Sequence, residues 1–544
     1  MKAAELFVRC LENEGVTTIY GIPGEENLDV MDALVESDIE FVTTRHEQGA
    51  AFMADVRGRL TGRAGVCLST LGPGATNLVT GVADANMDGA PVVAIAGQAA
   101  TTRMHKESHQ VVDLEAIFAP VCKYTAQIRA PQIVAEVVRK AFKVAQAEKP
   151  GVSFLEFPED VAAAASEGKS PLRRQAAMPS MPPPFKIEQA AALIGRAAAP
   201  IIMAGNGVVR AGASEALVAF AERVNIPVAT TFMAKGVIPS SHPLALGTVG
   251  LQANDYVACG FHKADLVICV GYDIVEYHPF LWNAHGHLML VHIHASPAEV
   301  DECYIVEAGV VGDIGASLGA IAERCRPHDA PLATELHQAI LDDIARAADS
   351  EAFPLKPQKI IWDLRAAMGP EDIVISDVGA HKLWMARMYQ AERPNTCIIS
   401  NGFAAMGIAV PGAIAARHAL PNRKVVAVTG DAGFMMNSQE IETALRLKTP
   451  VVILIWNDSA YGLIRWKQME HFSREAGVSF TNPDFVAYAR SFGAAGIRIE
   501  KAVDLAPALT RALAADTVTV IDCPVDYSEN LRLPHIAGEM VCQD

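Results

Sequence analysis

Residues 424–458 read KVVAVTGDAGFMMNSQEIETALRLKTPVVILIWND, and the order of apolar and polar residues in this stretch decides the fold class. Two short apolar runs rich in β-branched residues, Val425–Thr429 and Pro450–Trp456, are typical of buried strands. Asn437 with Glu440 is typical of a helix start between them. Strand, helix and strand at this spacing predict a right-handed crossover between parallel strands, so both strands should end at the same edge of a sheet.

Polar residues follow both predicted strands at that edge. Asp431 follows the first strand, and Asn457 and Asp458 follow the second. Open parallel sheets bind ligands at this edge, where two carboxylates suit a hard divalent cation. Gly430 and Gly433 would let backbone N–H groups approach an anion at the start of the helix. The pattern favours a metal and phosphate site, although a glycine-aspartate turn after a strand is also a common structural feature of α/β proteins.

The two halves of this pattern together resemble the cofactor motif of the thiamine-diphosphate enzyme family, which is Gly-Asp-Gly followed further along the chain by Asn-Asn or Asn-Asp. The resemblance implies that Asp431, Asp458 and the backbone carbonyl of Ala460 are magnesium ligands. The third motif residue departs from the family, because Ala432 stands where glycine is usual. A methyl group there requires a negative φ.

Length and composition predict a multidomain globular protein. The chain has 544 residues, enough for about three domains. Hydrophobic residues make up 51% and charged residues 20%, which argues against long disordered regions. The formal net charge of −17 argues against non-specific nucleic-acid binding, so we expect no nucleic-acid partner.

Cysteine usage and hydropathy indicate a cytoplasmic protein. The ten cysteines include no Cys-x-x-Cys pair, which fits reduced thiols better than a zinc site or a disulfide framework. The N-terminus begins directly with a predicted amphipathic helix, which is not typical of a signal peptide. Apolar runs stay well short of the roughly 18 uncharged residues of a membrane span, so we expect no membrane partner.

Helical and strand patterns alternate along the whole chain. They predict an α/β protein with three consecutive doubly wound parallel-sheet domains. The predicted domains are an N-terminal pyrimidine-binding domain at 1–165, a central domain at 185–327 and a C-terminal diphosphate- and magnesium-binding domain at 357–544. Segments between them are expected to be linkers. The first and third domains share a strand followed by a glycine turn, a weak hint of internal duplication.

A second candidate site lies in the first domain at Glu47, in the sequence Arg45-His46-Glu47-Gln48. Its position in the first turn of a predicted helix also suits a water-facing carboxylate favoured by the helix dipole. Together with the Gly-Pro-Gly turn at 72–74 and Asn77, however, this segment is similar to the region that carries the family's activating glutamate. The resemblance implies that Glu47 hydrogen-bonds N1′ of the aminopyrimidine. The family grips its cofactor between two subunits, which implies a homodimer or homotetramer.

Further cofactor contacts are implied by the same resemblance. His381 would reach the diphosphate, and Met406 would prop the cofactor into its bent conformation. A methionine at a helix start is otherwise typical of a core residue. The implied cofactor-binding residues are Pro23, Gly24, Asn77, His381, Ala404, Met406, Gly430, Gly433 and Phe434.

Within the family, the chain is closest to acetolactate synthases of the catabolic type. His109 and Gln110 stand where these enzymes carry a His-Gln pair that faces the substrate. Biosynthetic relatives hold FAD with an arginine-bearing segment, whereas residues 272–276 here read YDIVE, so we expect no FAD. The chain also lacks the adjacent His-His pair that simple 2-oxo-acid decarboxylases use to deliver protons.

These features predict a carboligase that decarboxylates pyruvate and joins the two-carbon unit to a second pyruvate, giving 2-acetolactate. His109 and Gln110 would orient the 2-oxo acid substrate. A decarboxylase, or a carboligase acting on another oxo acid such as glyoxylate, is the alternative within the family. A nucleotide-binding dehydrogenase is the alternative from another class, and it would require a complete glycine fingerprint. The turn at 205–207 lacks the third glycine of that fingerprint.

Overall fold

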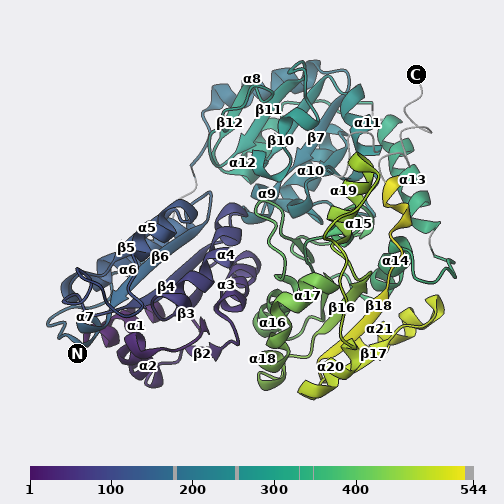
Figure 1. Cartoon of the computed structure of the whole chain (residues 1–544). Helices are drawn as coiled ribbons and strands as arrows, with labels where there is room; N and C mark the ends of the chain where they lie inside the picture. The colour runs from purple at the N-terminus through teal and green to yellow at the C-terminus, as the bar shows by residue number, and fades with distance from the viewer. Residues whose placement is uncertain (176–179, 251–255, 330, 347, 533–544) are drawn as a thin grey trace. The chain divides into compact units, whose positions relative to one another are not determined.

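The computed structural model describes residues 1–175, 180–250, 256–329, 331–346 and 348–532. Their named strands form three six-stranded sheets, and every pairing between these strands is parallel (Figure 1). The predicted α/β architecture with three doubly wound sheets is therefore confirmed.

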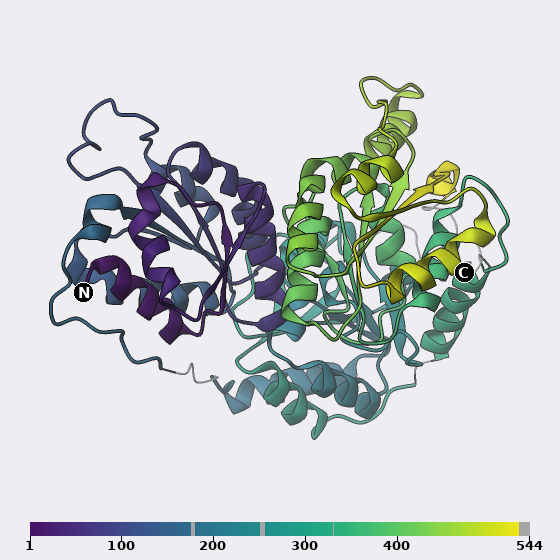
Figure 2. The same cartoon turned by 90° about the horizontal axis from the view of Figure 1, so that it is seen from below.

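The first sheet is formed by the N-terminal part of the chain, with helices on both faces (Figure 2). Its strand order is β2-β1-β3-β4-β6-β5. The strands are β1 (Thr18–Gly21), β2 (Glu40–Thr43), β3 (Gly65–Ser69), β4 (Val92–Gln98), β5 (Tyr124–Gln127) and β6 (Val152–Pro158). The helices are α1 (Ala3–Glu14), α2 (Leu28–Val35), α3 (Glu47–Thr61), α4 (Pro73–Met87), α5 (Leu114–Phe118), α6 (Val134–Gln146) and α7 (Glu159–Ala163).

The second sheet has the order β12-β11-β10-β7-β8-β9, which reverses direction between β7 and β10. Its strands are β7 (Pro200–Ala204), β8 (Val228–Thr230), β9 (Ala245–Thr248), β10 (Leu266–Val270), β11 (Met289–His294) and β12 (Val306–Val311). Its helices are α8 (Pro184–Arg196), α9 (Asn206–Arg210), α10 (Ser214–Val224), α11 (Tyr256–Lys263) and α12 (Ile314–Ala322). The next helix, α13 (Pro331–Ala345), occupies a segment that the sequence predicts to be a linker, so that prediction was wrong there.

The third sheet has the order β14-β13-β15-β16-β18-β17, which repeats the order of the first sheet. This agrees with the hint of duplication. Its strands are β13 (Ile373–Ser376), β14 (Cys397–Ile399), β15 (Val425–Gly430), β16 (Val452–Asn457), β17 (Ala495–Arg498) and β18 (Thr519–Pro524). The helices are α14 (Pro357–Ala367), α15 (Ala380–Met388), α16 (Ala409–Ala419), α17 (Asp431–Asn437), α18 (Ile441–Arg446), α19 (Gly462–Phe472), α20 (Phe485–Phe492) and α21 (Leu505–Ala514).

By its internal contacts the chain divides into two compact units. The first unit joins Met1–Ala177 with Gly402–Asn422 and Met436–Pro450, and the second contains the remaining segments. In the first unit, α16 therefore packs against α3. Apolar strand residues supply the cores, as in β16, where Ile453, Leu454 and Ile455 are fully buried.

The helix between β15 and β16 begins earlier than the sequence predicts. It starts at Asp431 as α17, and Asn437 makes no side-chain cap. Instead, the Asn437 amide donates to the carbonyl of Gly407 at 2.9 Å, so the predicted capping pair was wrong. Ala432 lies within α17 and is not among the residues with positive φ, so its methyl group fits the helical backbone.

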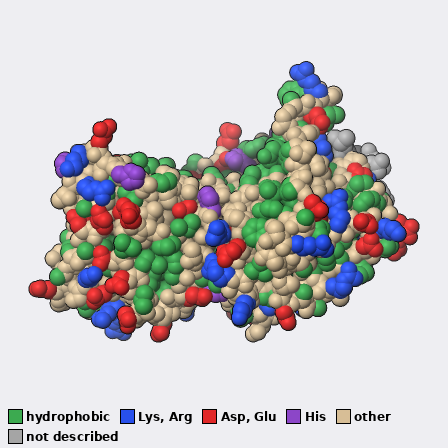
Figure 3. All heavy atoms as spheres, turned by 60° about the horizontal axis from the view of Figure 1, so that its bottom comes forward, with side chains coloured by type: hydrophobic (Ala, Val, Ile, Leu, Met, Phe, Trp, Pro, Cys, Tyr) green, Lys and Arg blue, Asp and Glu red, His purple; other side chains and the backbone are tan. Residues whose placement is uncertain are grey.

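Charged residues of both signs are mixed on one face of the molecule. On the face shown in Figure 3, Lys and Arg side chains alternate with Asp and Glu side chains, so the described residues form no continuous basic surface there. None of the described helices combines the length and apolar character that are needed to span a bilayer.

Candidate active site

Two aspartates follow neighbouring strands of the third sheet. Gly430 in β15 pairs with Trp456 in β16, so Asp431 and Asp458 leave the sheet at the same edge, as predicted. Asp431 is 1% exposed, and its Oδ2 accepts hydrogen bonds at 2.7 Å from the N–H of Ser459 and at 2.7 Å from the amide of Asn482.

The surroundings of these aspartates make their charges costly. Burial, followed by the negative charge of Asp431, raises the pKa of Asp458 to about 7. Burial also raises the pKa of Asp431. The Arg465 guanidinium, at 2.9 Å from Asp458, offsets only part of this cost. Two buried carboxylates with raised pKa values form a donor set that fits a hard divalent cation.

The rest of a metal shell would have to come from elsewhere. Among the described residues, no group of three or more His, Cys, Asp and Glu side chains is arranged to hold a metal ion. Backbone or ligand oxygens are therefore needed beside Asp431 and Asp458. Ala460, the third predicted ligand, is buried close by and bridges to Ser479.

His381 lies beside the glycine turn of the same edge. A Cβ at Gly430 would lie 3.5 Å from its ring, so glycine gives the imidazole room there. Burial lowers the pKa of His381 to about 4, which keeps the ring neutral at pH 7. Its Nε2 is buried and has no hydrogen-bond partner among the residues that the structure describes. An orphaned polar atom of this kind is the feature that a bound phosphate oxygen would satisfy.

Gly433 and Phe434 are both packed closely against neighbouring side chains. A Cβ at Gly433 would lie 3.1 Å from the carboxylate of Asp377, so this glycine permits close packing of that side chain. Phe434 is fully buried, and its ring packs edge-on against Phe485 and Tyr488. Only the backbone of Phe434 could therefore contact a ligand.

In the first unit, Glu47 is the first residue of α3, which follows β2. It is only 8% exposed, so the alternative of a water-facing carboxylate was wrong. Its Oε2 accepts a hydrogen bond at 2.9 Å from the amide of Asn77 in α4. A Cβ at Gly74 would lie 3.3 Å from Oε1, and the missing side chain leaves room on that side of the carboxylate.

The remaining predicted residues of the first sheet lie in segments that follow the carboxyl ends of its strands. Gly24 packs against Thr70, where a Cβ would clash at 2.4 Å, and Pro23 beside it is exposed. His109 and Gln110 are also exposed. A Cβ at Gly72 would lie 2.7 Å from the Gln110 carbonyl oxygen, so the His109-Gln110 loop lies against the Gly-Pro-Gly turn.

Ala404 and Met406 belong to a loop of the first unit that precedes α16. Ala404 has a φ of +58°, a left-handed conformation that residues with a Cβ seldom adopt. Met406 is half-buried. The structure thus places Glu47, Asn77 and this loop in the first unit, and Asp431, Asp458 and His381 in the second.

Several residues around these sites escaped the sequence analysis. Glu440 accepts hydrogen bonds from the N–H groups of Arg45 and His46, directly before Glu47, at 3.0 and 3.1 Å. Asn482 holds Asp431 in place. Glu440 entered the sequence analysis only as part of a helix-start pattern, and Asn482 belongs to no motif. Their partners here are distant in the sequence, so no local signal could have found these contacts.

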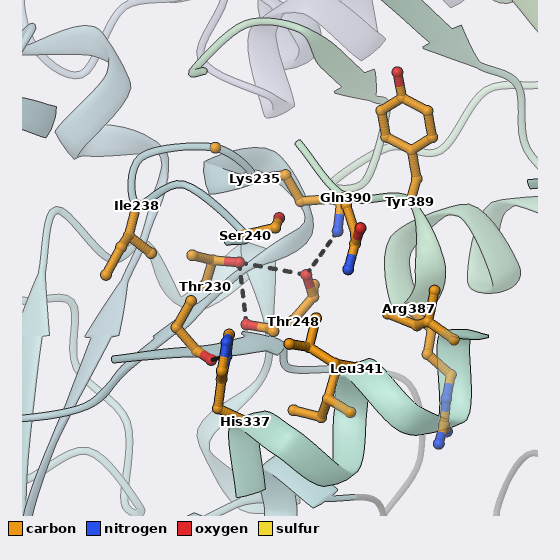
Figure 4. A pocket seen from close by; sticks show the side chains of 15 residues that line it. Thr230, Lys235, Ile238, Ser240, Thr248, His337, Leu341, Arg387, Tyr389 and Gln390 are labelled. Carbon is orange, nitrogen blue, oxygen red and sulfur yellow. Dashed lines mark hydrogen bonds between the residues drawn. The ribbon is translucent and has the colours of Figure 1, made fainter. Parts of the chain in front are cut away.

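The second unit also contains a pocket that the predicted site residues do not line (Figure 4). Its volume of about 40 Å³ would hold about three water molecules. Lys235 on its wall donates to the Thr248 hydroxyl at 3.2 Å and to the carbonyl of Ala386, near the C-terminus of α15, at 2.8 Å. The lysine thereby caps a helix end, and none of the predicted site residues lines this pocket.

Comparison with known proteins agrees with these features. Three family models match the chain: the N-terminal TPP binding domain of thiamine pyrophosphate enzymes at residues 1–117, their central domain at 187–321 and their C-terminal TPP binding domain at 377–523.

Similar proteins cover nearly the whole chain. An acetolactate synthase of Bacillus subtilis is 37% identical over 99% of this chain and 97% of its own length. A catabolic acetolactate synthase of Raoultella terrigena is 36% identical over the same shares. A probable acetolactate synthase large subunit of Methanocaldococcus jannaschii is 34% identical over 99% of this chain and 94% of its own length. The chain therefore belongs to the thiamine pyrophosphate enzyme family and is an acetolactate synthase-like enzyme.

Proposed function

We propose that this enzyme decarboxylates pyruvate and joins the resulting two-carbon unit to a second pyruvate, giving 2-acetolactate. The observation that carries the proposal is the buried carboxylate of Glu47, which is held by Asn77 on one oxygen and left open beside Gly74 on the other. The names of the similar proteins support the same reaction.

Thiamine diphosphate, when bound, supplies the electron sink for decarboxylation. Glu47 would hold a proton at N1′ of the aminopyrimidine, which requires a carboxyl group with a free oxygen. His109 and Gln110, both exposed beside the Gly-Pro-Gly turn, would donate hydrogen bonds that orient the oxo acid. Pro23, Gly24 and Asn77 would form the rest of the pyrimidine pocket.

At the third sheet, Asp431, Asp458 and the carbonyl of Ala460 would hold Mg²⁺, and His381 Nε2 would reach the diphosphate. Burial of both carboxylates and the missing partner of Nε2 support this assignment. Backbone groups of Gly430, Gly433 and Phe434, at the start of α17, would complete the diphosphate site.

We propose a homodimer or homotetramer, with domains at 1–165, 185–327 and 357–544. Glu47 belongs to the first unit of the chain, and Asp431 and Asp458 belong to the second. The Methanocaldococcus relative is named a large subunit, a name that itself refers to an assembly.

Flavin does not fit the central sheet. Open α/β sheets bind ligands where the strand order reverses, which here lies between β7 and β10. Glu276 fills that position, because its carboxylate accepts hydrogen bonds from the N–H groups of Asn206 and Asp273 and from the Thr231 hydroxyl. A pyrophosphate there would face the negative charge of Glu276. The three donors at this position already bond that carboxylate, so none of them is left for the pyrophosphate.

Residues 272–276 contain no arginine, but a cation from outside this segment reaches it. In the structure, Arg210 in α9 pairs with Asp273 at 3.0 Å, so the charge of Asp273 is compensated. The case against flavin therefore rests on Glu276 alone.

The reaction itself is tested by product analysis. Purified protein supplied with pyruvate, thiamine diphosphate and Mg²⁺ should produce 2-acetolactate, identified by mass, and omission of thiamine diphosphate should abolish the product. Parallel incubations with glyoxylate as the second substrate test acceptor choice. Acetaldehyde as the main product from pyruvate would contradict the proposal and favour a decarboxylase.

Glu47→Gln should bind cofactor but lose activity by a factor of about 10² to 10⁴, because an amide cannot hold the N1′ proton. Steady-state turnover of pyruvate and cofactor titration measure the two properties separately. Glu442→Gln, which removes a half-exposed carboxylate paired with Arg446, is the matched control and should keep wild-type turnover. More than about half of wild-type activity in Glu47→Gln would rule out this role.

Asp431→Asn and Asp458→Asn should each weaken magnesium and cofactor binding by more than about tenfold, since losing a direct ligand should cost at least as much as losing an outer-shell partner. Quenching of the buried Trp456, which lies 6.1 Å from the His381 ring, can report binding. Asp526→Asn, which removes a partner of Lys356 in the same unit, is the control. Unchanged affinities in both variants would place the metal elsewhere.

The purified protein is expected to be colourless and fully active without added flavin, because Glu276 occupies the switch point of the central sheet and the reaction is not a redox reaction. Absorbance spectra and turnover with and without FAD measure this. Stoichiometric flavin absorbance after purification, or activity that appears only with FAD, would overturn the expectation.

A further inference from the structure

A buried charge cluster joins helices α3 and α4 in the first unit. The Arg59 guanidinium donates to Asp55 at 2.6 Å, to Asp88 at 2.7 Å and to Asp84 at 3.4 Å. The three aspartates are at most 2% exposed, and the Arg59 side chain is 9% exposed. One guanidinium therefore faces three buried carboxylates.

This ratio is unfavourable for a cluster that serves only to join two helices. A single buried carboxylate would neutralise Arg59, and each further one adds a desolvation cost. Burial raises the pKa of Asp84, with the charges of Asp88 and Asp55 as further causes. Asp84 and Asp88 also lie at the C-terminal end of α4, where the helix dipole disfavours negative charge. Other hydrogen-bond donors must offset these costs.

Those donors come from the loop before α16. The N–H of Gly402 donates to Asp88 at 2.5 Å, and the N–H of Ala405 donates to Asp84 at 3.0 Å. Both bonds lie within the first unit. Hydrogen bonds from N–H groups to a buried charge are stronger than those between neutral groups.

The two bonds flank the strained residue of the loop. Ala404, with φ at +58°, stands between Gly402 and Ala405. Such a conformation persists only where the surroundings hold it on both sides. A third bond, from the Asn437 amide to the Gly407 carbonyl, fixes the far end of the loop.

We propose that Asp84 and Asp88 are positioning residues that hold the 402–407 loop in the conformation in which Ala404 and Met406 contact the bound cofactor. The inference rests on the proposed cofactor role of that loop. The proposal explains why three carboxylates surround one guanidinium: Asp84 and Asp88 accept hydrogen bonds from the loop, and Arg59 offsets part of their negative charge.

Asp55 supplies a matched comparison. It is fully buried and bonds the Arg59 guanidinium through both oxygens, but it makes no hydrogen bond to the loop among the described residues. Replacing it removes the same chemical group from the same cluster. Loss of stability alone should therefore be similar in Asp55→Ala and Asp84→Ala, whereas loss of loop position should be confined to Asp84→Ala and Asp88→Ala.

The test measures thiamine diphosphate binding to the full chain at saturating Mg²⁺ without substrate, together with Tm. Asp84→Ala and Asp88→Ala should raise the Kd about tenfold or more, the size expected for a lost hydrogen bond to a charged group. Asp55→Ala should lower Tm but leave Kd within about twofold. Asp84→Asn keeps an acceptor for the Ala405 N–H and should recover most of the affinity.

Two further measurements keep the outcomes distinct. Hydrogen exchange at residues 402–407 in cofactor-free protein should be faster in Asp84→Ala than in Asp55→Ala, a readout that does not depend on the proposed reaction. Ala404→Gly added to Asp84→Ala should restore part of the affinity, because glycine adopts positive φ without strain. Equal rises of Kd in Asp55→Ala and Asp84→Ala, or faster exchange with unchanged Kd, would overturn the inference. Wild-type protein that does not bind the cofactor would overturn the proposed function instead.

Discussion

Parallel strand pairing is the constraint on which the candidate sites depend. A crossover between parallel strands returns the chain to the same edge, so residues that follow different strands meet there. The pairing of Gly430 with Trp456 places Asp431 beside Asp458 in this way. The first and third sheets reverse their strand order between the first and third strands, counted along the chain, and the central sheet reverses between its first and fourth strands, β7 and β10. Each reversal opens one edge of the kind at which open α/β sheets bind ligands.

The three edges differ in how one polar side chain at each edge is hydrogen-bonded. At the central sheet, the carboxylate of Glu276 accepts hydrogen bonds from three donors of the chain and fills the edge. At the first sheet, the Glu47 carboxylate accepts a hydrogen bond from the Asn77 amide, and Gly74 lies beside its other oxygen. At the third sheet, His381 Nε2 has no hydrogen-bond partner among the described residues. The central edge is thus filled by a carboxylate that the chain itself holds, whereas the other two edges present groups to which a ligand could bond.

Sequence reasoning succeeded where a local rule places a residue. The strands around Asp431 and Asp458, and the helix that begins at Glu47, follow from apolar runs and turn residues next to them. It failed where a distant partner decides: the bond from Ala405 to Asp84 spans 321 positions, and that from Arg45 to Glu440 spans 395. The pattern of Asn437 and Glu440 predicted a helix cap. Instead, the Asn437 side chain donates to the carbonyl of Gly407, and the Glu440 side chain accepts from the N–H of Arg45. The positive φ of Ala404 has no signal in the sequence, because alanine does not favour that conformation.

Excess buried negative charge is common to the candidate metal edge and the Arg59 cluster, and it links ligand binding to stability. Asp458 binds its proton more tightly in the folded chain than in the unfolded one, since its pKa rises from 3.8 to about 7. The free energy of unfolding should therefore fall as pH rises from about 4 to about 7, where the folded chain loses that proton. A divalent cation bound at the same edge would offset the charge that the proton otherwise neutralises, and it would bind best when both carboxylates are ionised. Such a cation would restore stability in the pH range where the apo-protein has lost it, so occupancy of the proposed site and integrity of the third sheet would depend on each other.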